Sequence, residues 1–291
     1  MSSLVFFNGK ILPAAEARVS AFDAGFTHAA GLFETLRVYN GRIMRFGDHA
    51  QRLLASAKAL HMAVDVTAEY LEQGIREVLA ANKLDEARVR LTVTPGPIPK
   101  PGDTGEVPPG VTTVITAEPV RMYPPELYKQ GMRVCICPYR QNRLDPLAGH
   151  KTLAYLPRLL AMKDAAERKC NESLWFNTDN RLAEGSVCNV FTVQKGVVVT
   201  PPLDTPVLPG TVRKAVIEVA KAAGMSVEER SIDINELLGS EEVFLTGSVL
   251  EIMPVTAIER HEVGTGEVGA VTRRLRELYA ELVGRECGRN G

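Results

Sequence analysis

The stretch Gly149-His150-Lys151-Thr152-Leu153-Ala154-Tyr155-Leu156-Pro157 decides how this sequence is interpreted. A single lysine stands there, after a loop rich in turn residues and at the start of a long amphipathic helix. An isolated glutamate follows at a distance, in Leu182-Ala183-Glu184-Gly185-Ser186. Most lysines are solvated surface residues, so Lys151 is informative only because other segments supply the remaining parts of one site.

A lysine and a carboxylate are the two groups that a pyridoxal 5'-phosphate enzyme needs. The amine forms an imine with the cofactor aldehyde, and the carboxylate keeps the pyridine nitrogen protonated, so that the ring withdraws electrons from a carbanion. The sequence therefore predicts Lys151 as the catalytic residue and Glu184 as the partner of the ring nitrogen.

Length and composition narrow the class of protein. The chain has 291 residues, 45% of them hydrophobic, which is enough for one large core or for two unequal ones, and we expect two. Its formal net charge is -1 and its charges are interspersed, so no nucleic-acid partner is expected. The N-terminus lacks the pattern of a signal peptide and no apolar run reaches membrane-spanning length, so a cytoplasmic protein without a membrane partner is expected. The five scattered cysteines predict neither a disulfide framework nor a metal site.

The sequence of the N-terminal part predicts a mixture of helices and antiparallel sheet. Asn8-Gly9 and Asn40-Gly41 each predict a hairpin turn. Helices are expected over 49–60, capped by Gly47-Asp48, and over 67–81, with strands over 88–94 and 111–116. The Pro- and Gly-rich residues 95–110 predict a surface loop whose candidate role is a lid. We expect a small domain over 1–118, a linker over 119–131 and a larger domain over 132–291.

The C-terminal part alternates strands with tight turns, which argues against a doubly wound parallel sheet. The fold class is therefore α+β. Strands are expected over 132–138, 173–177, 187–193, 197–200 and 242–245, and helices over 155–168, 211–223 and 271–283.

Three further segments suit a phosphate group. Leu208-Pro209-Gly210-Thr211-Val212-Arg213 places a glycine and a threonine at a helix start, where amide groups and the helix dipole favour an anion. Thr246-Gly247-Ser248 follows an apolar strand and predicts a second anion nest. Arg52, one turn into a helix, can add a fixed charge. Each segment has an ordinary structural explanation when it is taken alone.

Together these motifs resemble the class IV pyridoxal phosphate aminotransferases, a family of branched-chain aminotransferases, D-amino acid aminotransferases and aminodeoxychorismate lyases. The resemblance spans nearly the whole chain and also covers Asn189-Val190-Phe191 and Glu251 to Val255. It implies a two-domain fold with a small α/β N-terminal domain and a larger pseudo-barrel C-terminal domain. It also implies a homodimer, an amino acid and a 2-oxo acid as substrates, and two half-reactions.

The resemblance further implies a role for each motif. Lys151 would form the imine and move the proton at the substrate alpha carbon, and Tyr155 would bond the phenolic oxygen of the cofactor. Leu208 would pack on the ring. The implied phosphate contacts are Arg52, Gly210, Thr211, Val212, Gly247 and Ser248, and the implied substrate contacts are Phe33, Arg37, Arg88, Arg90, Ser248 and Val249.

Substrate choice stays open at the level of sequence. Arg88 and Arg90 alternate along one strand, so both can face a substrate carboxylate. Arg88 departs from the branched-chain pattern, whereas Pro95-Gly96 departs from the D-amino acid pattern. We therefore keep two groups of candidate substrates, branched-chain or other L-amino acids and D-amino acids. Two alternatives remain: a 4-amino-4-deoxychorismate lyase that releases pyruvate and 4-aminobenzoate, and a non-catalytic binding module without bound cofactor.

Overall fold

The computed structural model describes residues 3–98, 110–205 and 207–288, which form two compact units. The first unit contains the chain up to Arg121, the segment His150–Ala154 and a short stretch that begins at Glu286. The second contains Met122–Gly149 and Tyr155–Arg285. Most of the expected lid, 95–110, lies outside the described residues. The expected domain limits stay a prediction, and the lysine segment belongs to the first unit.

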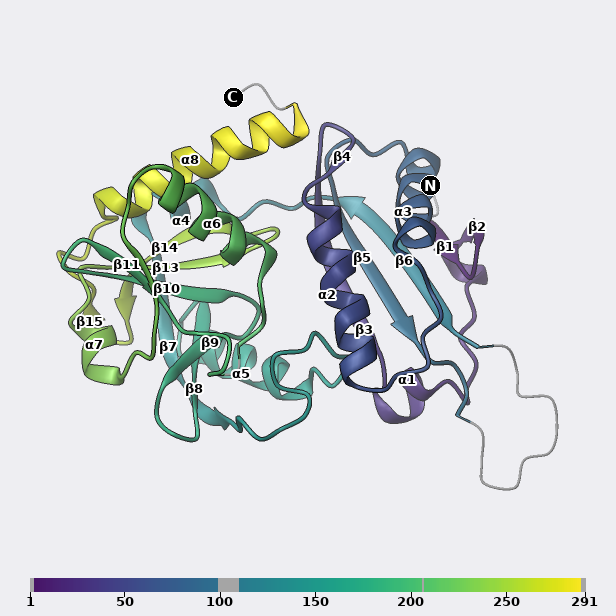
Figure 1. Cartoon of the computed structure of the whole chain (residues 1–291), viewed down its shortest axis with the longest axis horizontal. Helices are drawn as coiled ribbons and strands as arrows, with labels where there is room; N and C mark the ends of the chain where they lie inside the picture. The colour runs from purple at the N-terminus through teal and green to yellow at the C-terminus, as the bar shows by residue number, and fades with distance from the viewer. Residues whose placement is uncertain (1–2, 99–109, 206, 289–291) are drawn as a thin grey trace. The chain divides into compact units, whose positions relative to one another are not determined.

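The first unit is built on a six-stranded antiparallel sheet with the order β2-β1-β6-β5-β3-β4 (Figure 1). Asn8 and Gly9 have φ of 48° and 83°, and Asn40 and Gly41 have φ of 49° and 71°. Both predicted hairpins are confirmed, because a two-residue turn of this kind needs positive φ at both positions. The strands are β1 (Leu4–Phe7), β2 (Lys10–Pro13), β3 (Leu32–Tyr39), β4 (Arg42–Ile43), β5 (Ala87–Thr94) and β6 (Thr112–Pro119).

Two long helices, α2 (Phe46–Ala59) and α3 (Ala68–Asn82), pack against this sheet and bury its core. The Thr67 hydroxyl caps α3 by accepting from the Tyr70 amide at 3.2 Å. The cap expected at Gly47-Asp48 is wrong, because Arg45 is the N-cap residue of α2, in the left-handed conformation. Asp48 lies in the first turn instead, where its negative charge is favourable. The unit also contains η1 (Ala14–Glu16) and α1 (Ala24–His28).

The second unit is built on a nine-stranded sheet (Figure 1). Eight of its strands have the order β12-β11-β10-β13-β14-β7-β8-β9, and the ninth, β15, pairs with β14. Most pairings are antiparallel, so the exclusion of a doubly wound fold is confirmed and the α+β class stands. The strands are β7 (Met132–Gln141), β8 (Glu172–Asn177), β9 (Leu182–Gly185), β10 (Asn189–Gln194), β11 (Val197–Thr200), β12 (Val227–Glu229), β13 (Glu242–Gly247), β14 (Glu251–Ile258) and β15 (His261–Glu262).

Five helices complete the described part of the second unit. They are α4 (Pro125–Gln130), α5 (Leu156–Glu167), α6 (Thr211–Ala222), α7 (Ile234–Leu238) and α8 (Ala270–Cys287). Helix α4 falls inside the stretch expected to be a linker, and it packs on β14, where the Tyr128 hydroxyl donates to the Leu250 carbonyl at 3.2 Å. No helix in the described part of the chain combines the length and the apolar composition needed to cross a lipid bilayer.

Candidate active site

The lysine segment is an extra extended piece beside the first unit's sheet. The Phe33 amide donates to the Lys151 carbonyl at 3.0 Å, and the Leu153 amide donates to the Gly31 carbonyl at 2.9 Å. These two main-chain bonds fix the backbone that directly follows the lysine side chain, on either side of Thr152. The Lys151 ammonium lies 4.4 Å from the centre of the Phe33 ring.

The histidine before the lysine contacts a different element from the lysine, helix α2. His150 Nδ1 lies 2.9 Å from the Ser56 hydroxyl on α2. Burial lowers the pKa of His150, which favours its neutral form. His150 therefore helps to fix the segment on the helix, while Lys151 faces Phe33.

Arg90 lies against the same aromatic ring as the lysine. Its guanidinium carbon is 3.3 Å from the centre of the Phe33 ring, a distance that permits stacking of the cation on the ring. Two cations therefore meet at Phe33, an arrangement that suits the carboxylate of an amino acid or a keto acid. The structure brings together Phe33, Arg90 and Lys151, three of the residues singled out in the sequence.

The other two candidate arginines have different partners. Arg88 forms an ion pair of 2.5 Å with Glu118 across the sheet. Arg37 is buried, and its terminal nitrogens bond Glu86 and the carbonyls of Val38 and Ala87. A role of Arg37 and Arg88 in substrate binding stays a prediction.

Arg52 is held inside the first unit by a buried carboxylate that the sequence interpretation missed. Arg52 Nε and Nη2 donate to the two oxygens of Glu34 at 2.8 and 2.5 Å. His49 Nδ1 lies 2.8 Å from Glu34 Oε2. Burial alone would raise the pKa of Glu34, but Arg52 and His49 outweigh it and lower the pKa from 4.5 to about 2. A guanidinium has five N–H donors, so this pairing is compatible with a further contact to phosphate.

The lowered pKa of Glu34 gives a prediction for stability against pH. Glu34 stabilises the fold above its unfolded pKa of 4.5, and this contribution is lost as the pH falls towards 2. We expect Glu34→Gln to lower the free energy of unfolding at pH 7 by roughly 3 kcal/mol, because it leaves Arg52 without its counter-charge. Urea titrations from pH 7 to pH 2.5 measure the difference from the wild type, which should shrink below pH 4.5.

The matched control for this prediction is Glu118→Gln, since Glu118 is exposed and pairs with an exposed arginine. Its effect should stay below about 1 kcal/mol. A Glu34→Gln effect that is the same at every pH would contradict the assigned charge state.

Glu184 lies on β9 in the second unit, where it is buried and held in place by several partners. Arg158 Nη2 donates to Oε1 at 2.5 Å, while the Leu208 amide donates to Oε2 at 3.0 Å. The Asn189 side-chain amide also faces Oε2, at 3.5 Å, and bonds the Leu208 carbonyl at 2.9 Å. The carboxylate is therefore fixed in orientation and lies beside the Leu208 loop. Glu184 and Leu208, both singled out in the sequence, thus lie side by side.

Tyr155, the N-cap residue of α5, lies close to the same group. Its hydroxyl donates to the Ser186 carbonyl at 3.2 Å. Burial, more than the nearby charges, raises the pKa of Tyr155 to about 12, so the phenol keeps its proton at neutral pH. A phenol has one proton to donate, so Tyr155 can serve an anionic phenolic oxygen only by giving up its bond to the Ser186 carbonyl.

The phosphate motif begins helix α6 as expected. Gly210 is the N-cap residue and has no side chain to cap the first-turn amides, which begin at Thr211 and Val212. A Cβ atom built on Gly210 would lie 2.0 Å from Asn189 Oδ1. Because the φ of Gly210 is -66°, the position requires glycine for space rather than for backbone conformation.

Gly210→Ala tests this close approach. To admit a methyl group, Asn189 must move and give up its bonds to Leu208 and Glu184. We expect cofactor affinity to fall roughly tenfold, which corresponds to about 1.4 kcal/mol. A double-mutant cycle with Asn189→Ala measures the coupling, and Gly210→Ala should cost much less in that background. Additive losses would show that the two residues act independently.

The second anion nest lies at the end of β13. Thr246 faces Asn189 across the sheet, and its buried hydroxyl oxygen has no hydrogen-bond partner among the described residues. Gly247 and Ser248 follow, with Val249 next in the chain. A buried polar atom without a partner is expensive, so this hydroxyl is a candidate ligand contact.

Four site residues were missed from the sequence because each acts only through a distant partner. Glu34 and Arg158 carried one usable signal, a charge among mostly apolar neighbours in the sequence. Asn189 stands out in the sequence only as part of a family motif. His49 lies on a helix, where a packed or solvated histidine is the default expectation, and burial does lower its pKa even though Glu34 opposes the shift.

Comparison with known proteins gives a consistent result. Residues 31–258 match the family model for amino-transferase class IV. The chain is 33% identical over 282 residues to a putative branched-chain-amino-acid aminotransferase of Methanocaldococcus jannaschii, covering 96% of each chain. It is 28% identical to a D-alanine aminotransferase of Bacillus licheniformis, over 93% of this chain and 94% of the relative.

Solved structures agree with the sequence comparison. The branched-chain amino acid aminotransferase of Escherichia coli superposes with a TM-score of 0.91 at 28% identity, over 98% of this chain and 96% of that one. The pyridoxal 5'-phosphate form of the branched-chain enzyme from Thermobaculum terrenum gives 0.84 at 28% identity, over 99% and 97%. The match covers both compact units and all the motifs described above. The chain therefore belongs to the class IV aminotransferase family.

Proposed function

We propose that Lys151 is the catalytic amine of a pyridoxal 5'-phosphate aminotransferase and that Glu184 is the partner of the cofactor's ring nitrogen. The chain is an aminotransferase, and pyridoxal 5'-phosphate is the cofactor of its family. The observation that supports the residue assignment is the Lys151 segment, whose backbone is bonded at the Lys151 carbonyl and the Leu153 amide to Phe33 and Gly31 at the start of β3 and just before it. A lysine on a flexible loop would have no such restraint.

The residues present fit this cofactor. The Lys151 amine is directed to an aromatic ring, Glu184 is a fixed acid, and Gly210 leaves room at the start of a helix. When bound, the cofactor supplies an aldehyde for the amine and a ring that withdraws electrons. Glu184 would hold the proton at the ring nitrogen, and Leu208 would pack on a ring face. Thr211, Val212, Gly247, Ser248 and Arg52 would hold the phosphate, with Tyr155 at the phenolic oxygen.

Lys151 would have a second task as a base. Its amine would hold and move the proton at the substrate alpha carbon. Phe33 and Arg90 would orient the substrate carboxylate, with Arg37, Arg88, Ser248 and Val249 as further contacts. The amino group would pass from the amino acid to a 2-oxo acid such as 2-oxoglutarate or pyruvate, and the donor would leave as its own 2-oxo acid.

The choice of substrate is tested by a panel of L- and D-amino acids mixed with the purified holoenzyme. Absorbance follows conversion of the aldehyde form of the cofactor to its amine form. The relatives named above include both branched-chain and D-alanine aminotransferases, so both groups belong in the panel. Those names do not favour the lyase alternative. Pyruvate release from 4-amino-4-deoxychorismate without a keto-acid acceptor would reverse this conclusion.

A homodimer is proposed from an apolar surface on α5. Leu156, Leu159 and Leu160 on this helix are exposed by 65%, 54% and 45%. Contiguous exposed leucines of this kind mark an interface, and a second copy is the simplest occupant. The cytoplasmic location expected from the sequence stays a prediction.

Leu159→Glu should weaken this dimer because it places a charge in the apolar surface. Sedimentation velocity should show monomers at protein concentrations where the wild type is dimeric. The matched control is Lys163→Glu, a charge change at an exposed polar position of the same helix. Equal behaviour of both variants would exclude α5 from the interface.

A further inference from the structure

We propose that Arg158 is a positioning residue that places a fixed charge beside Glu184 and holds its carboxylate in one orientation, so that the proton between Glu184 and the cofactor stays on the ring nitrogen. This inference rests on the proposed function, in which Glu184 meets that nitrogen. The first turn of α5, which follows the lysine segment in the chain, would then contribute to the chemistry through Arg158.

The geometry of Arg158 is that of a clamp on one carboxylate and the backbone next to it. Nη2 donates to Glu184 Oε1 at 2.5 Å. Nη1 donates to the carbonyls of Gly185 and Ser186 at 3.0 and 3.1 Å. The guanidinium therefore binds three consecutive residues, and Glu184 cannot rotate without breaking a charge-assisted bond.

The second carboxylate oxygen is held as well. Oε2 receives the Leu208 amide at 3.0 Å and faces the Asn189 amide at 3.5 Å. An ionised carboxylate has about four acceptor positions, two on each oxygen. With Oε2 occupied by two donors and Oε1 by Arg158, the remaining acceptor position on Oε1 is the one that suits a pyridine N–H group.

Three titratable groups of the described chain lie near the pair, and none of them supplies positive charge. They are Tyr155, Glu172 and Cys188, and burial raises the pKa of each, to about 12 for Tyr155. All three shifts favour the neutral form. Burial would lower the pKa of Arg158, but Glu184 and the other neighbours more than offset it, so the guanidinium keeps its charge.

A fixed cation lowers the proton affinity of the carboxylate beside it. When Glu184 shares a proton with a basic ring nitrogen, Arg158 therefore favours the arrangement with the proton on nitrogen. Without Arg158, Glu184 would lose the cation beside it and the bond that fixes Oε1. The ring would then be a weaker electron acceptor.

The test measures the protonation state of the nitrogen directly. Holoenzyme is reconstituted with cofactor labelled with ¹⁵N at the ring nitrogen, and its ¹⁵N chemical shift separates protonated from neutral nitrogen. The wild type should give the protonated shift. Arg158→Met should move the signal towards the neutral position and lower kcat about tenfold or more with a smaller change in KM, and Arg158→Lys should restore part of both effects.

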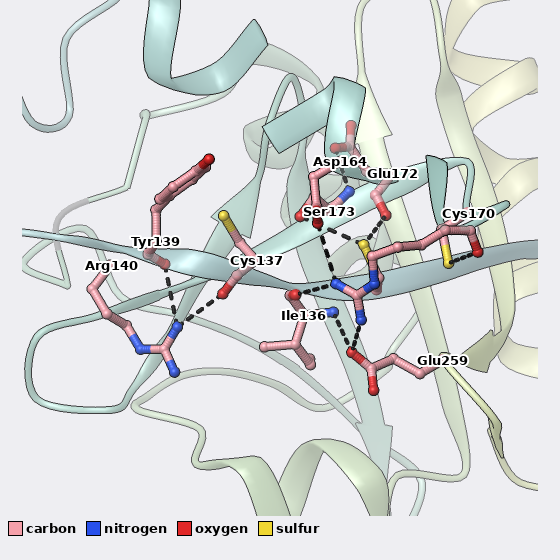
Figure 2. Close-up of polar contacts among 11 residues, drawn as sticks. Ile136, Cys137, Tyr139, Arg140, Asp164, Cys170, Glu172, Ser173 and Glu259 are labelled. Atoms are coloured by element: carbon pink, nitrogen blue, oxygen red, sulfur yellow. Dashed lines mark hydrogen bonds and ion pairs between the residues drawn. The ribbon is translucent and has the colours of Figure 1, made fainter. Parts of the chain in front are cut away.

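The matched control is Arg168→Met, the same substitution just after the end of the same helix. The partners of Arg168 include Glu259, Asp164 and the Ile136 carbonyl, which Figure 2 shows. The arginine that bonds Glu184 is Arg158. The control should leave the ¹⁵N signal and kcat unchanged. Circular dichroism checks folding, and Arg158→Gln replaces Arg158→Met if the latter does not fold.

The outcomes separate this inference from the proposed function. Glu184→Gln should remove the protonated signal. If Glu184→Gln moves the signal and the Arg158 variants do not, the inference is overturned and the proposed function stands. If neither variant moves it, Glu184 is not the partner of the ring nitrogen and both proposals fall together.

Discussion

The Lys151→Ala variant should lose at least roughly 10⁴-fold in the rate at which an amino acid converts the bound cofactor to its amine form. Two functions are removed at once, the covalent amine and the base that moves the alpha proton. The fold should persist, because the segment is held by main-chain bonds that alanine retains. Stopped-flow absorbance measures the loss, and circular dichroism measures the fold.

A second measurement of the same variant is independent of turnover. Borohydride reduction of the wild type should attach the cofactor to the peptide that carries Lys151, which mass spectrometry detects. Lys163→Ala is the control, since Lys163 is an exposed lysine whose ion pair with Glu167 is long, at 3.9 Å. Retained turnover in Lys151→Ala, or cofactor attached elsewhere, would refute the assignment.

The Glu184→Gln variant should lose roughly 10² to 10³-fold in kcat, with a smaller change in KM. Glutamine keeps the shape of the side chain but carries no negative charge, so it cannot stabilise a protonated ring nitrogen as charge develops in the transition state. Steady-state kinetics with the best substrate of the panel measures the effect. Glu184→Asp, which keeps the charge on a shorter side chain, should fall between Glu184→Gln and the wild type.

The control for this variant is Glu259→Gln, because Glu259 is exposed and pairs with Arg168 outside the site. Its kcat should equal that of the wild type. Unchanged kcat in Glu184→Gln would mean that the acid opposite the ring lies elsewhere in the chain.

Regular elements with a strong local pattern could be predicted from the sequence. The Asn-Gly turns, the helices α2, α3, α5, α6 and α8 and the alternating strand β5 all appear within a few residues of their expected limits. Except for α5, whose leucines are exposed, each carries its signal within its own residues, as turn chemistry or as hydrophobic periodicity. Local sequence is sufficient for such elements.

Short or irregular elements could not be predicted. β9, β12, β15, α1, α4 and α7 have at most six residues each, too few for a periodic pattern. β14 has eight residues, but Pro254 lies within it and argues against a strand. Partner strands on either side stabilise β14 in spite of this proline, and only the tertiary structure supplies them.

The sequence by itself determined the family, the candidate lysine and acid, and the glycine at the start of α6, because each motif is contiguous and its chemistry can be read from residue types. The tertiary structure alone decided which groups hold these residues. Glu34 reaches Arg52 from another element, Arg158 reaches Glu184, and Asn189 reaches Gly210. Such pairs leave no local pattern, because the attraction between buried charges depends on distance in space and not on separation along the chain.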